Sequence, residues 1–481
     1  MARRTNRTLT VVALLLGLFI AAMEMTVVST AMPTAVGDLG GLHLYAWVFA
    51  AYMLTATVTL PIHGKLADLY GRKPVMLAGL ALFLSGSFLC GHADGMSELI
   101  LYRAIQGLGA GAVQPIAMTI VGDLYDVHQR ARIQGALSAV WGVAGLIGPI
   151  LGGAIVHWLS WRWVFYVNIP LGLGCAAALL LAYHEKVERR EHRLDVAGAL
   201  LLSFTVVLAL LGTRARGEGL VYLPAAAVAL VVFLQTERRA SEPLLPLDLF
   251  AQPVIAVASS TGALVGAAMI SAVTFVPLYV QAVLSGSAYE AGSAIAPVAI
   301  GWPIASTLAG RILPRKGYRI LIRAGLALTF CAAAGLALLL RPEADLWTIR
   351  LIMLVYGLGL GLANTPLIIA VQSSVPWERR GVATASTLFS RTIGGTLAVG
   401  TLGSVLAAAL TAGGAPTEIA DKLLGPERSL LPQPLMQSLS GALQGGMESI
   451  FLAVAAIAFG GFAVSLLFPA VPIEPRKPEG A

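Results

Sequence analysis

Charged residues are scarce in this sequence. Asp, Glu, Lys and Arg make up 12% of its 481 residues, whereas a soluble domain usually carries about a quarter. Hydrophobic residues make up 57%, and the mean hydropathy is +0.81. The 52 glycines and 25 prolines are spread through apolar segments, which suits helices that pack closely or bend in lipid. This composition excludes a soluble, collagen-like or disordered chain and predicts an all-α integral membrane protein.

Disulfide, metal and catalytic patterns are also lacking. The cysteines Cys90, Cys175 and Cys331 all fall in apolar runs, which argues against a disulfide framework. The seven histidines are scattered, and none has a Cys, Asp or Glu at the spacing of a metal site. The sequence shows no nucleophile elbow and no phosphate-binding loop. We therefore expect neither an enzyme nor a bound metal or cofactor.

Long apolar runs are abundant. A membrane-spanning helix needs about 20 apolar residues, because every backbone polar group must be satisfied within the segment. The first run follows Arg3, Arg4 and Arg7 and is too long for the core of a signal peptide, so we expect an uncleaved first span. The fourteen candidate spans are residues 9–32, 46–64, 75–92, 98–121, 133–157, 163–183, 195–213, 220–236, 252–282, 289–310, 320–340, 347–371, 381–410 and 449–469.

The basic residues behind the net charge of +7 are distributed unevenly between the loops on the two sides of the membrane. Most of the 32 Lys and Arg residues fall in the segments that lie on the same side as the N-terminus. By the positive-inside rule, we expect both termini in the cytoplasm. This distribution explains the basic charge without a nucleic-acid partner.

Two pairs of segments repeat along the chain. "GKLADLYGRK" (64–73) returns as "GRILPRKGYR" (310–319), and "IQGLGAG" (105–111) returns as "VYGLGLG" (355–361). Two homologous six-helix halves with an insert of two helices account for this period. We therefore predict three parts, namely residues 1–183, 184–250 and 251–481.

Glu24 and Arg103 interrupt two of the apolar runs. A charged side chain near the bilayer centre costs about 2.5–3.5 kcal/mol on insertion scales, so each should face the protein interior. Glu24 shares a helix face with small residues, and we expect this face to pack against other helices or to line a central cavity, where Glu24 can gain and lose a proton. The alternatives are a Glu24 tied permanently to an arginine or a backbone group, and an Arg103 that reaches the interface.

Two motifs contain glycine, one in the loop that joins the second and third helices and one within the fifth helix. In "GKLADLYGRKP" (64–74), we expect glycines that allow a tight turn and an Asp68 that pairs with Arg72 or caps a neighbouring helix, against a plain solvated turn as the alternative. In "GVAGLIGPILGG" (142–153), small residues allow close packing around a bend at Pro149.

Taken together, these motifs resemble those of the major facilitator superfamily, and specifically its fourteen-helix drug:proton antiporter branch. "WRWVFYVNIP" (161–170) also resembles the start of the sixth helix in that branch. The sequence departs from the branch by having Glu24 in place of Asp, Ser29 in place of Asn, Leu69 in place of a basic residue and Ala144 in place of Gly. Glu24 keeps the carboxyl group of the first motif. The matching residues are Thr26, Ala31 and Pro33; Gly64, Asp68, Gly71, Arg72 and Lys73; Arg103, Gln106, Gly107 and Gly109; and Gly148, Pro149, Gly152 and Gly153.

The resemblance implies a major facilitator fold of two six-helix bundles plus two inserted helices, 14 in all, in the plasma or inner membrane. It implies export of amphipathic, hydrophobic or cationic compounds by alternating access, driven by the proton motive force without a cofactor. Glu24 and Arg103 would couple protons, the motif at 64–73 would gate the cytoplasmic side, and the motif at 148–153 would be that of an antiporter. We expect a monomer whose partners are substrates, protons and membrane lipids.

Further polar and aromatic residues at membrane depth are candidates for a substrate cavity, with helix packing as the alternative for each. They are Met25, Tyr52, Gln106, Gln114, Trp141 and Asn364. Two other functions stay open. One is export of a lipid or a specific metabolite, for which the apolar outer segment 411–448 could provide a contact surface. The other is a receptor or scaffold that does not transport.

Overall fold

The computed structural model describes residues 5–125, 127–185, 195–212, 219–240, 243, 245, 247–341, 344–376, 379–412 and 433–470. The regular elements that these residues form are helices, as predicted. The first part of the chain forms α1 (Arg7–Leu39), η1 (Leu42–Leu44), α2 (Tyr45–Tyr70), α3 (Arg72–Gly91), α4 (Met96–Leu124), α5 (Val127–Trp158), α6 (Trp163–Tyr166) and α7 (Asn168–Ala182). The remainder forms α8 (Val196–Gly212), α9 (Gly219–Arg239), η2 (Leu247–Ala251), α10 (Pro253–Ala282), α11 (Ala288–Leu339), α12 (Leu346–Ser373), α13 (Arg380–Ala412) and α15 (Gln433–Ser465).

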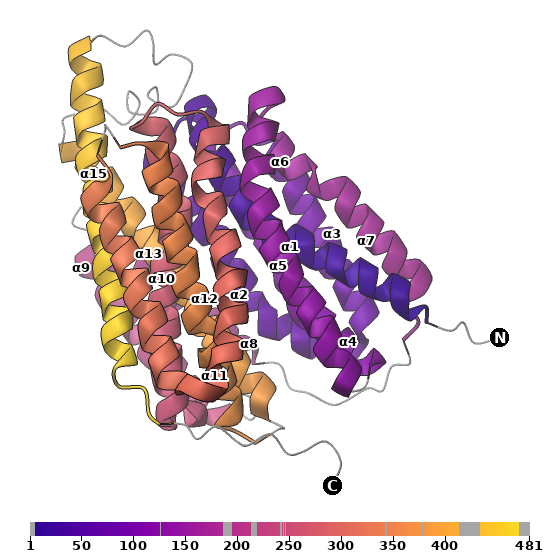
Figure 1. Ribbon diagram of the computed structural model, residues 1–481. Helices are drawn as coiled ribbons and strands as arrows, with labels where there is room; N and C mark the ends of the chain where they lie inside the picture. Colours follow the sequence, from indigo (N-terminus) through magenta and orange to yellow (C-terminus); the bar gives the residue numbers. More distant parts are fainter. Residues whose placement is uncertain are drawn as a thin grey trace.

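The helices form two bundles that lie side by side (Figure 1). Helices α1 to α7 make the N-terminal bundle, and α10 to α15 make the C-terminal bundle. Among the described residues, 12 helical stretches are long and apolar enough to cross a membrane, and α8 is a shorter apolar helix. The chain is therefore a multi-pass membrane protein. The count of fourteen spans and the part boundaries at 183 and 250 stay predictions.

The repeat seen in the sequence is matched by equivalent backbone turns. Gly71 has φ 99° and ψ 151° and forms the whole connection between α2 and α3. Gly317 has φ 78° and ψ 167° and divides α11 into two segments, 288–316 and 318–339. Only glycine adopts this backbone region readily. The sequence predicted that residues 64–74 form the loop between these helices, and this loop is much shorter in the structure. Residues 64–70 are the last turns of α2, and a single glycine makes the turn.

The glycines of the second repeated motif make equivalent helix contacts. A Cβ on Gly111 of α4 would meet the Ala56 carbonyl oxygen of α2 at 2.6 Å, and one on Gly361 of α12 would meet the Ser306 nitrogen of the first α11 segment at 2.9 Å. Such positions let helix backbones touch, as in other membrane helix pairs. The two segments of α11 are therefore the counterparts of α2 and α3.

The two bundles meet at the upper end of the molecule in Figure 1, and they separate toward the lower end, where α1 begins and α15 ends. Near the upper end, Thr34 Oγ1 donates to Gln281 Oε1 at 3.2 Å, and Gln281 Nε2 donates to the Thr30 carbonyl at 3.0 Å. Tyr45 Oη donates to the Thr274 carbonyl at 2.8 Å in the same region. These hydrogen bonds join α1 and α2 to α10 and hold the upper ends together.

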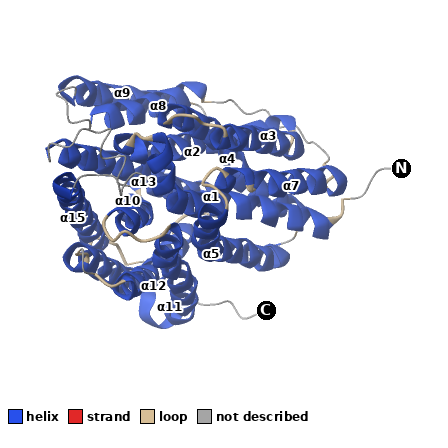
Figure 2. Ribbon diagram, turned by 90° about the horizontal axis from the view of Figure 1, so that it is seen from above, coloured by secondary structure: helices blue, strands red, loops and turns tan. Residues whose placement is uncertain are grey.

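The inserted helices α8 and α9 pack beside both bundles, as the view from above shows (Figure 2). Leu202, Val206 and Leu210 of α8 share an apolar cluster with Leu54 of α2 and Ile393 of α13. The insert therefore covers one side of the junction between the bundles. Of the outer segment 411–448, residues 413–432 lie outside the described residues, and helices α13 and α15 account for its two ends.

Candidate functional site

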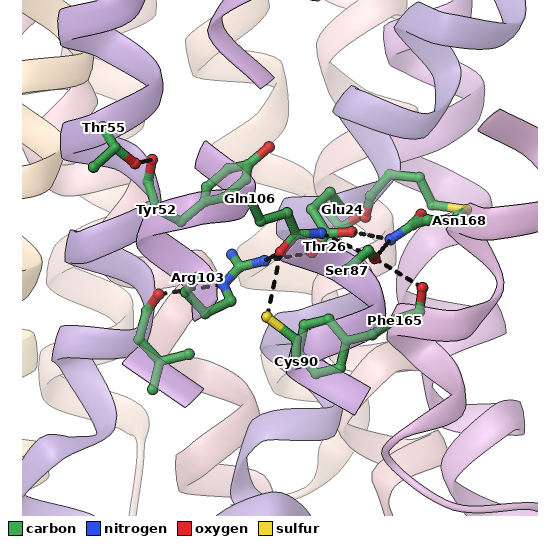
Figure 3. A network of polar contacts seen from close by, with 12 residues as sticks. Glu24, Thr26, Tyr52, Thr55, Ser87, Cys90, Arg103, Gln106, Phe165 and Asn168 are labelled. Atoms are coloured by element: carbon green, nitrogen blue, oxygen red, sulfur yellow. Dashed lines mark hydrogen bonds and ion pairs between the residues drawn. The ribbon is translucent and has the colours of Figure 1, made fainter. Parts of the chain in front are cut away.

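Glu24 and Arg103 form an ion pair in the core of the N-terminal bundle (Figure 3). Arg103 Nη1 of α4 donates to Glu24 Oε1 of α1 and also to Gln106 Oε1 at 2.6 Å. The Arg103 Nε donates to the Val48 carbonyl of α2 at 3.4 Å. Glu24 is 1% exposed and Arg103 is fully buried. Breaking such a buried pair by removing one partner costs about 3–5 kcal/mol, because an uncompensated charge is left behind.

An amide and a hydroxyl extend the pair to two more helices. Asn168 Nδ2 at the start of α7 donates to Glu24 Oε2 at 2.6 Å and to Ser87 Oγ of α3 at 3.0 Å. The Ser87 hydroxyl also accepts from Gln106 Nε2 at 3.2 Å and donates to the Phe165 carbonyl at 2.8 Å. All of these side chains are buried. We call Glu24, Ser87, Arg103, Gln106 and Asn168 the buried network.

Aromatic rings cover the guanidinium. The Arg103 Cζ atom lies 4.1 Å from the centroid of the Tyr52 ring and 5.8 Å from that of Phe165. A desolvated guanidinium over an aromatic face gains about 2 kcal/mol from the cation–π interaction. Tyr52 and Gln106, which were predicted as substrate-cavity residues, are both buried within the N-terminal bundle. Since the buried network occupies both oxygens of Glu24, a compound between the bundles cannot contact this carboxylate in the described conformation.

The remaining cavity candidates are not members of the buried network. Asn364 of α12 lines a cavity inside the C-terminal bundle. Met25 and Gln114 are half-buried, and Trp141 of α5 is 42% exposed. Neither Tyr52 nor Gln106 lines that cavity.

The basic residues of the motif at 64–73 are tied to the end of α7. Glu185 Oε1 accepts from the Arg72 backbone N–H at 2.8 Å, and Glu185 Oε2 accepts from that of Lys73 at 3.0 Å, so this carboxylate caps α3. Lys73 Nζ donates to the Leu180 and Tyr183 carbonyls at 2.9 and 2.6 Å. The Asp68 side chain, for which a pairing with Arg72 or a helix cap was expected, lies outside the described residues. No helix packs closely against Gly64, because a Cβ there would meet no described atom within 4 Å.

The motif at 148–153 packs α5 between α1 and α11. A Cβ on Gly152 would meet the Val27 carbonyl oxygen of α1 at 2.8 Å, and one on Gly153 would meet Tyr289 Cα of α11 at 2.6 Å. Gly148 likewise packs against Thr26 and the Met23 carbonyl, on either side of Glu24. We call the contact of α5 with α11 the inter-bundle seam. Its small residues are Gly142, Gly145 and Gly153 of α5, facing Ala288, Tyr289, Ala299 and Pro303 of α11.

Three members of these clusters were not predicted from the sequence. Asn168 and Ser87 are single polar residues in apolar runs, and Asn168 lies within the segment "WRWVFYVNIP" that was noted for its resemblance alone. Glu185 lies past the end of a span, where a charge is ordinary. Among the described residues, no group of three His, Cys, Asp or Glu side chains is placed to hold a metal ion.

The fold and the motif geometry together define a transporter of one known class. The chain belongs to the Major Facilitator Superfamily, whose family model matches residues 14–399, and it is not an enzyme. It is similar to the multidrug transporter protein MdtP of Bacillus subtilis (strain 168), with 37% identity over 416 residues, which cover 84% of this chain and 76% of that one. It is also similar to multidrug resistance protein 3 of the same organism, with 33% identity over 494 residues, 97% of this chain and 96% of that one.

Solved structures show the same fold. A bacterial homologue of the human lysosomal transporter Spinster, in an inward-facing and occupied conformation, aligns with a TM-score of 0.68 at 17% identity, over 96% of both chains. A D-xylose-proton symporter aligns with a TM-score of 0.64 at 14% identity, over 94% of this chain and 97% of that one. The major facilitator fold predicted from the sequence is thus confirmed.

Proposed function

We propose that this protein exports amphipathic, hydrophobic or cationic drug-like compounds from the cell in exchange for protons. The names of the two Bacillus subtilis relatives support drug export. The observation that carries proton exchange is the buried network, in which a carboxylate and a guanidinium are enclosed at membrane depth. Ionisable groups in such a position commonly mark ion or proton pathways.

We assign the lower end of the molecule in Figure 1 to the cytoplasm of a cell with a plasma or inner membrane. Arg72, Lys73, Arg238, Arg239 and Arg319 lie at helix ends on that side, as the positive-inside rule requires. The bundles are then joined at the outer face and separated toward the cytoplasm. In this arrangement a compound enters from the inside, and rocking of the bundles about the inter-bundle seam would expose it to the outside.

A proton on Glu24 would change the bonds between three helices. It removes the negative charge that faces Arg103, and it converts one carboxylate oxygen from an acceptor into a donor. Asn168 Oδ1 is buried without a hydrogen-bond partner in the described part of the chain, so it can accept this new donor after the amide turns. The buried network thus offers one set of bonds for the charged carboxylate and another for the neutral acid.

The change at Glu24 has a short path to the junction between the bundles. Met23 and Thr26, which flank Glu24 on α1, form the surface against which Gly148 of α5 packs. The same helix α5 carries the inter-bundle seam. A shift of α1 on protonation would therefore displace α5 against α11 and favour one orientation of the bundles. Each proton that crosses 100 mV supplies about 2.3 kcal/mol, enough for a gradient of about 50-fold in a neutral solute.

Export measured in everted membrane vesicles tests this function. Ethidium and a neutral hydrophobic dye would serve as substrates, with a pH-sensitive dye to record the protons released. We expect wild type to move ethidium against its gradient and to release protons when the substrate is added. Glu24→Gln should lose both effects, and Glu24→Asp should keep part of them because it retains the carboxyl group.

Glu448→Gln is the matched control, since Glu448 is an exposed carboxylate on α15 and lies outside the buried network. It should export as wild type does. If Glu24→Gln builds as steep an ethidium gradient as wild type, the coupling role of Glu24 is wrong. If wild type moves neither dye and releases no protons, the export function itself is wrong.

A further inference from the structure

Arg391 is a second arginine at membrane depth, in the C-terminal bundle. It lies about 16 Å along α13 from Arg380, which is near the middle of a hydrocarbon core of about 30 Å. Its side chain is partly exposed, whereas Arg103 is fully buried. A guanidinium at this depth usually faces the protein interior or a water-filled space and has an anionic or carbonyl partner.

Arg391 has no such partner in the described part of the chain. No described carboxylate, amide or backbone oxygen accepts a hydrogen bond from its guanidinium or forms an ion pair with it. Of the described acidic residues of the C-terminal bundle, Glu290 and Asp345 lie at the starts of α11 and α12. Glu448 lies in the middle of α15, where its exposed carboxylate accepts a hydrogen bond from Gln444 Nε2 at 3.0 Å and not from Arg391. Arg103, by contrast, has hydrogen-bond, ion-pair or cation–π partners, which are Glu24, Gln106, Val48 and Tyr52.

Arg391 lines a cavity between α10, α11, α12 and α13. Asn364 and Thr387 are the other polar residues of its wall, and the rest of the wall is apolar or glycine. The Thr387 hydroxyl donates to the Ala383 carbonyl, which leaves the Asn364 amide as a second polar group without a hydrogen-bond partner among the described residues. The cavity leaves about 20 Å³ for the centre of a water-sized group, which suits one small polar group and not a whole drug molecule.

We propose that Arg391, assisted by the Asn364 amide, binds the carboxylate of an amphipathic substrate. A guanidinium presents paired N–H donors that match the two oxygens of a carboxylate, and the bonds are charge-assisted. A carboxylate also supplies the counter-charge that Arg391 lacks among the described residues. The substrate class thus extends from neutral and cationic compounds to organic acids and zwitterions. This inference rests on the proposed export function, but the binding step itself needs no proton gradient.

The test compares two ligands that differ by one charge. Dansylglycine carries a free carboxylate, and its amide has the same dansyl ring without the charge. Binding of each to the purified protein in neutral detergent is followed by dansyl fluorescence. Wild type should bind the carboxylate about 10-fold more tightly than the amide, as one charge-assisted pair provides. Arg391→Gln should abolish this preference and leave the affinity for the amide unchanged.

Arg391→Lys and Arg350→Gln complete the set. The lysine keeps the charge without the paired donors, so it should retain a smaller preference for the carboxylate. Arg350 bonds Ser293 at the upper end of α12, away from the cavity, so Arg350→Gln should behave as wild type. Thermal melting of each variant shows that it is folded. Glu24→Gln, which should abolish coupled export, should keep the carboxylate preference, so the two proposals can fail separately.

Each of three results would overturn the proposal. The first is an unchanged carboxylate preference in Arg391→Gln, which would place the anion elsewhere. The second is displacement of dansylglycine, but not of its amide, by inorganic phosphate or chloride, which would indicate a site for small ions. The third is loss of the preference in nanodiscs of phosphatidylglycerol but not of phosphatidylcholine, together with Arg391-dependent retention of phosphatidylglycerol, which would make the ligand a lipid phosphate.

Discussion

Asn168 donates a hydrogen bond of 2.6 Å to Oε2 of Glu24, and these residues lie on α7 and α1 respectively. Arg103 of α4 takes the other carboxylate oxygen. The charged form of Glu24 is therefore held by donors from two different helices. Any change in the protonation of Glu24 alters the contacts of α1 with α4 and α7 together.

Replacing Asn168 by leucine removes one donor from the carboxylate. A hydrogen bond to a charged group contributes about 1.5–3 kcal/mol, and one pH unit corresponds to about 1.36 kcal/mol. The neutral acid loses only the weaker bond to Asn168 Oδ1, worth about 0.5–1.5 kcal/mol, so the charged form loses more. We therefore expect the midpoint of the pH dependence of ethidium export to move upward by about 1 unit. Ser87→Ala, which touches Asn168 and not Glu24, should move it less. A folded Asn168→Leu variant with the pH profile of wild type would contradict this role.

The pairing of Glu24 with Arg103 followed from the sequence only in part. A charge in a span requires an interior partner, which made an arginine tie one of the alternatives for Glu24. The position of the pair inside one bundle did not follow, because a face of small residues can equally pack or line a cavity. Asn168 was missed since one asparagine at a helix start carries no periodic signal, and its distance from Glu24 depends on how α7 packs on α1.

Other features could be predicted from local sequence motifs. The repeated motifs predicted two related halves, and the glycine turns at Gly71 and Gly317 have the same backbone conformation. The sequence could not predict that Glu185 pairs with Arg72 and Lys73. These contacts join residues that are 113 and 112 positions apart in the sequence. Long-range pairs of this kind depend on the tertiary arrangement and not on spacing.

A double substitution separates the contribution of the ion pair to stability from its role in proton-coupled export. Arg103→Met leaves Glu24 buried without a counter-charge, so we expect a loss of about 3–5 kcal/mol and a clear fall in melting temperature. Adding Glu24→Leu removes the unpaired charge, and the double variant should melt close to wild type. Neither variant should couple export to protons. Melting is followed by fluorescence-detected size exclusion. A double variant that is less stable than Arg103→Met alone would show that the pair is a net stabilising interaction.

The inter-bundle seam depends on the absence of a side chain at Gly153. A Cβ there would lie 2.6 Å from Tyr289 Cα and 2.7 Å from the Ala288 carbonyl oxygen, and backbone atoms cannot yield as a flexible side chain would. Overpacking of about 1–3 kcal/mol should shift the equilibrium away from the closed upper ends by about 5-fold or more. We therefore expect Gly153→Ala to reduce the population in which α1 and α10 are in contact.

Crosslinking measures this population. In a Cys331→Ser background, which removes the exposed cysteine, Thr34→Cys and Gln281→Cys are joined by a short bifunctional thiol reagent. The yield should fall in Gly153→Ala and stay unchanged in Gly445→Ala, where a Cβ would meet nothing within 4 Å. Equal yields in the two variants would exclude a role of the seam in closing the upper ends.

Replacing either turn glycine by alanine should change the stability of the protein in the same direction. Replacing the helical glycines nearby should change it in the opposite direction. Gly71 and Gly317 adopt a backbone region that is nearly exclusive to glycine, so alanine at either should destabilise the protein by about 1–3 kcal/mol. Gly64 and Gly310 lie within helices with open space around them, so alanine there should stabilise the protein by up to about 1 kcal/mol. Melting temperatures of the four single variants test this pattern. If Gly71→Ala lowers the melting temperature while Gly317→Ala does not, the second turn is not the structural counterpart of the first, and the equivalence of the two α11 segments with α2 and α3 is lost.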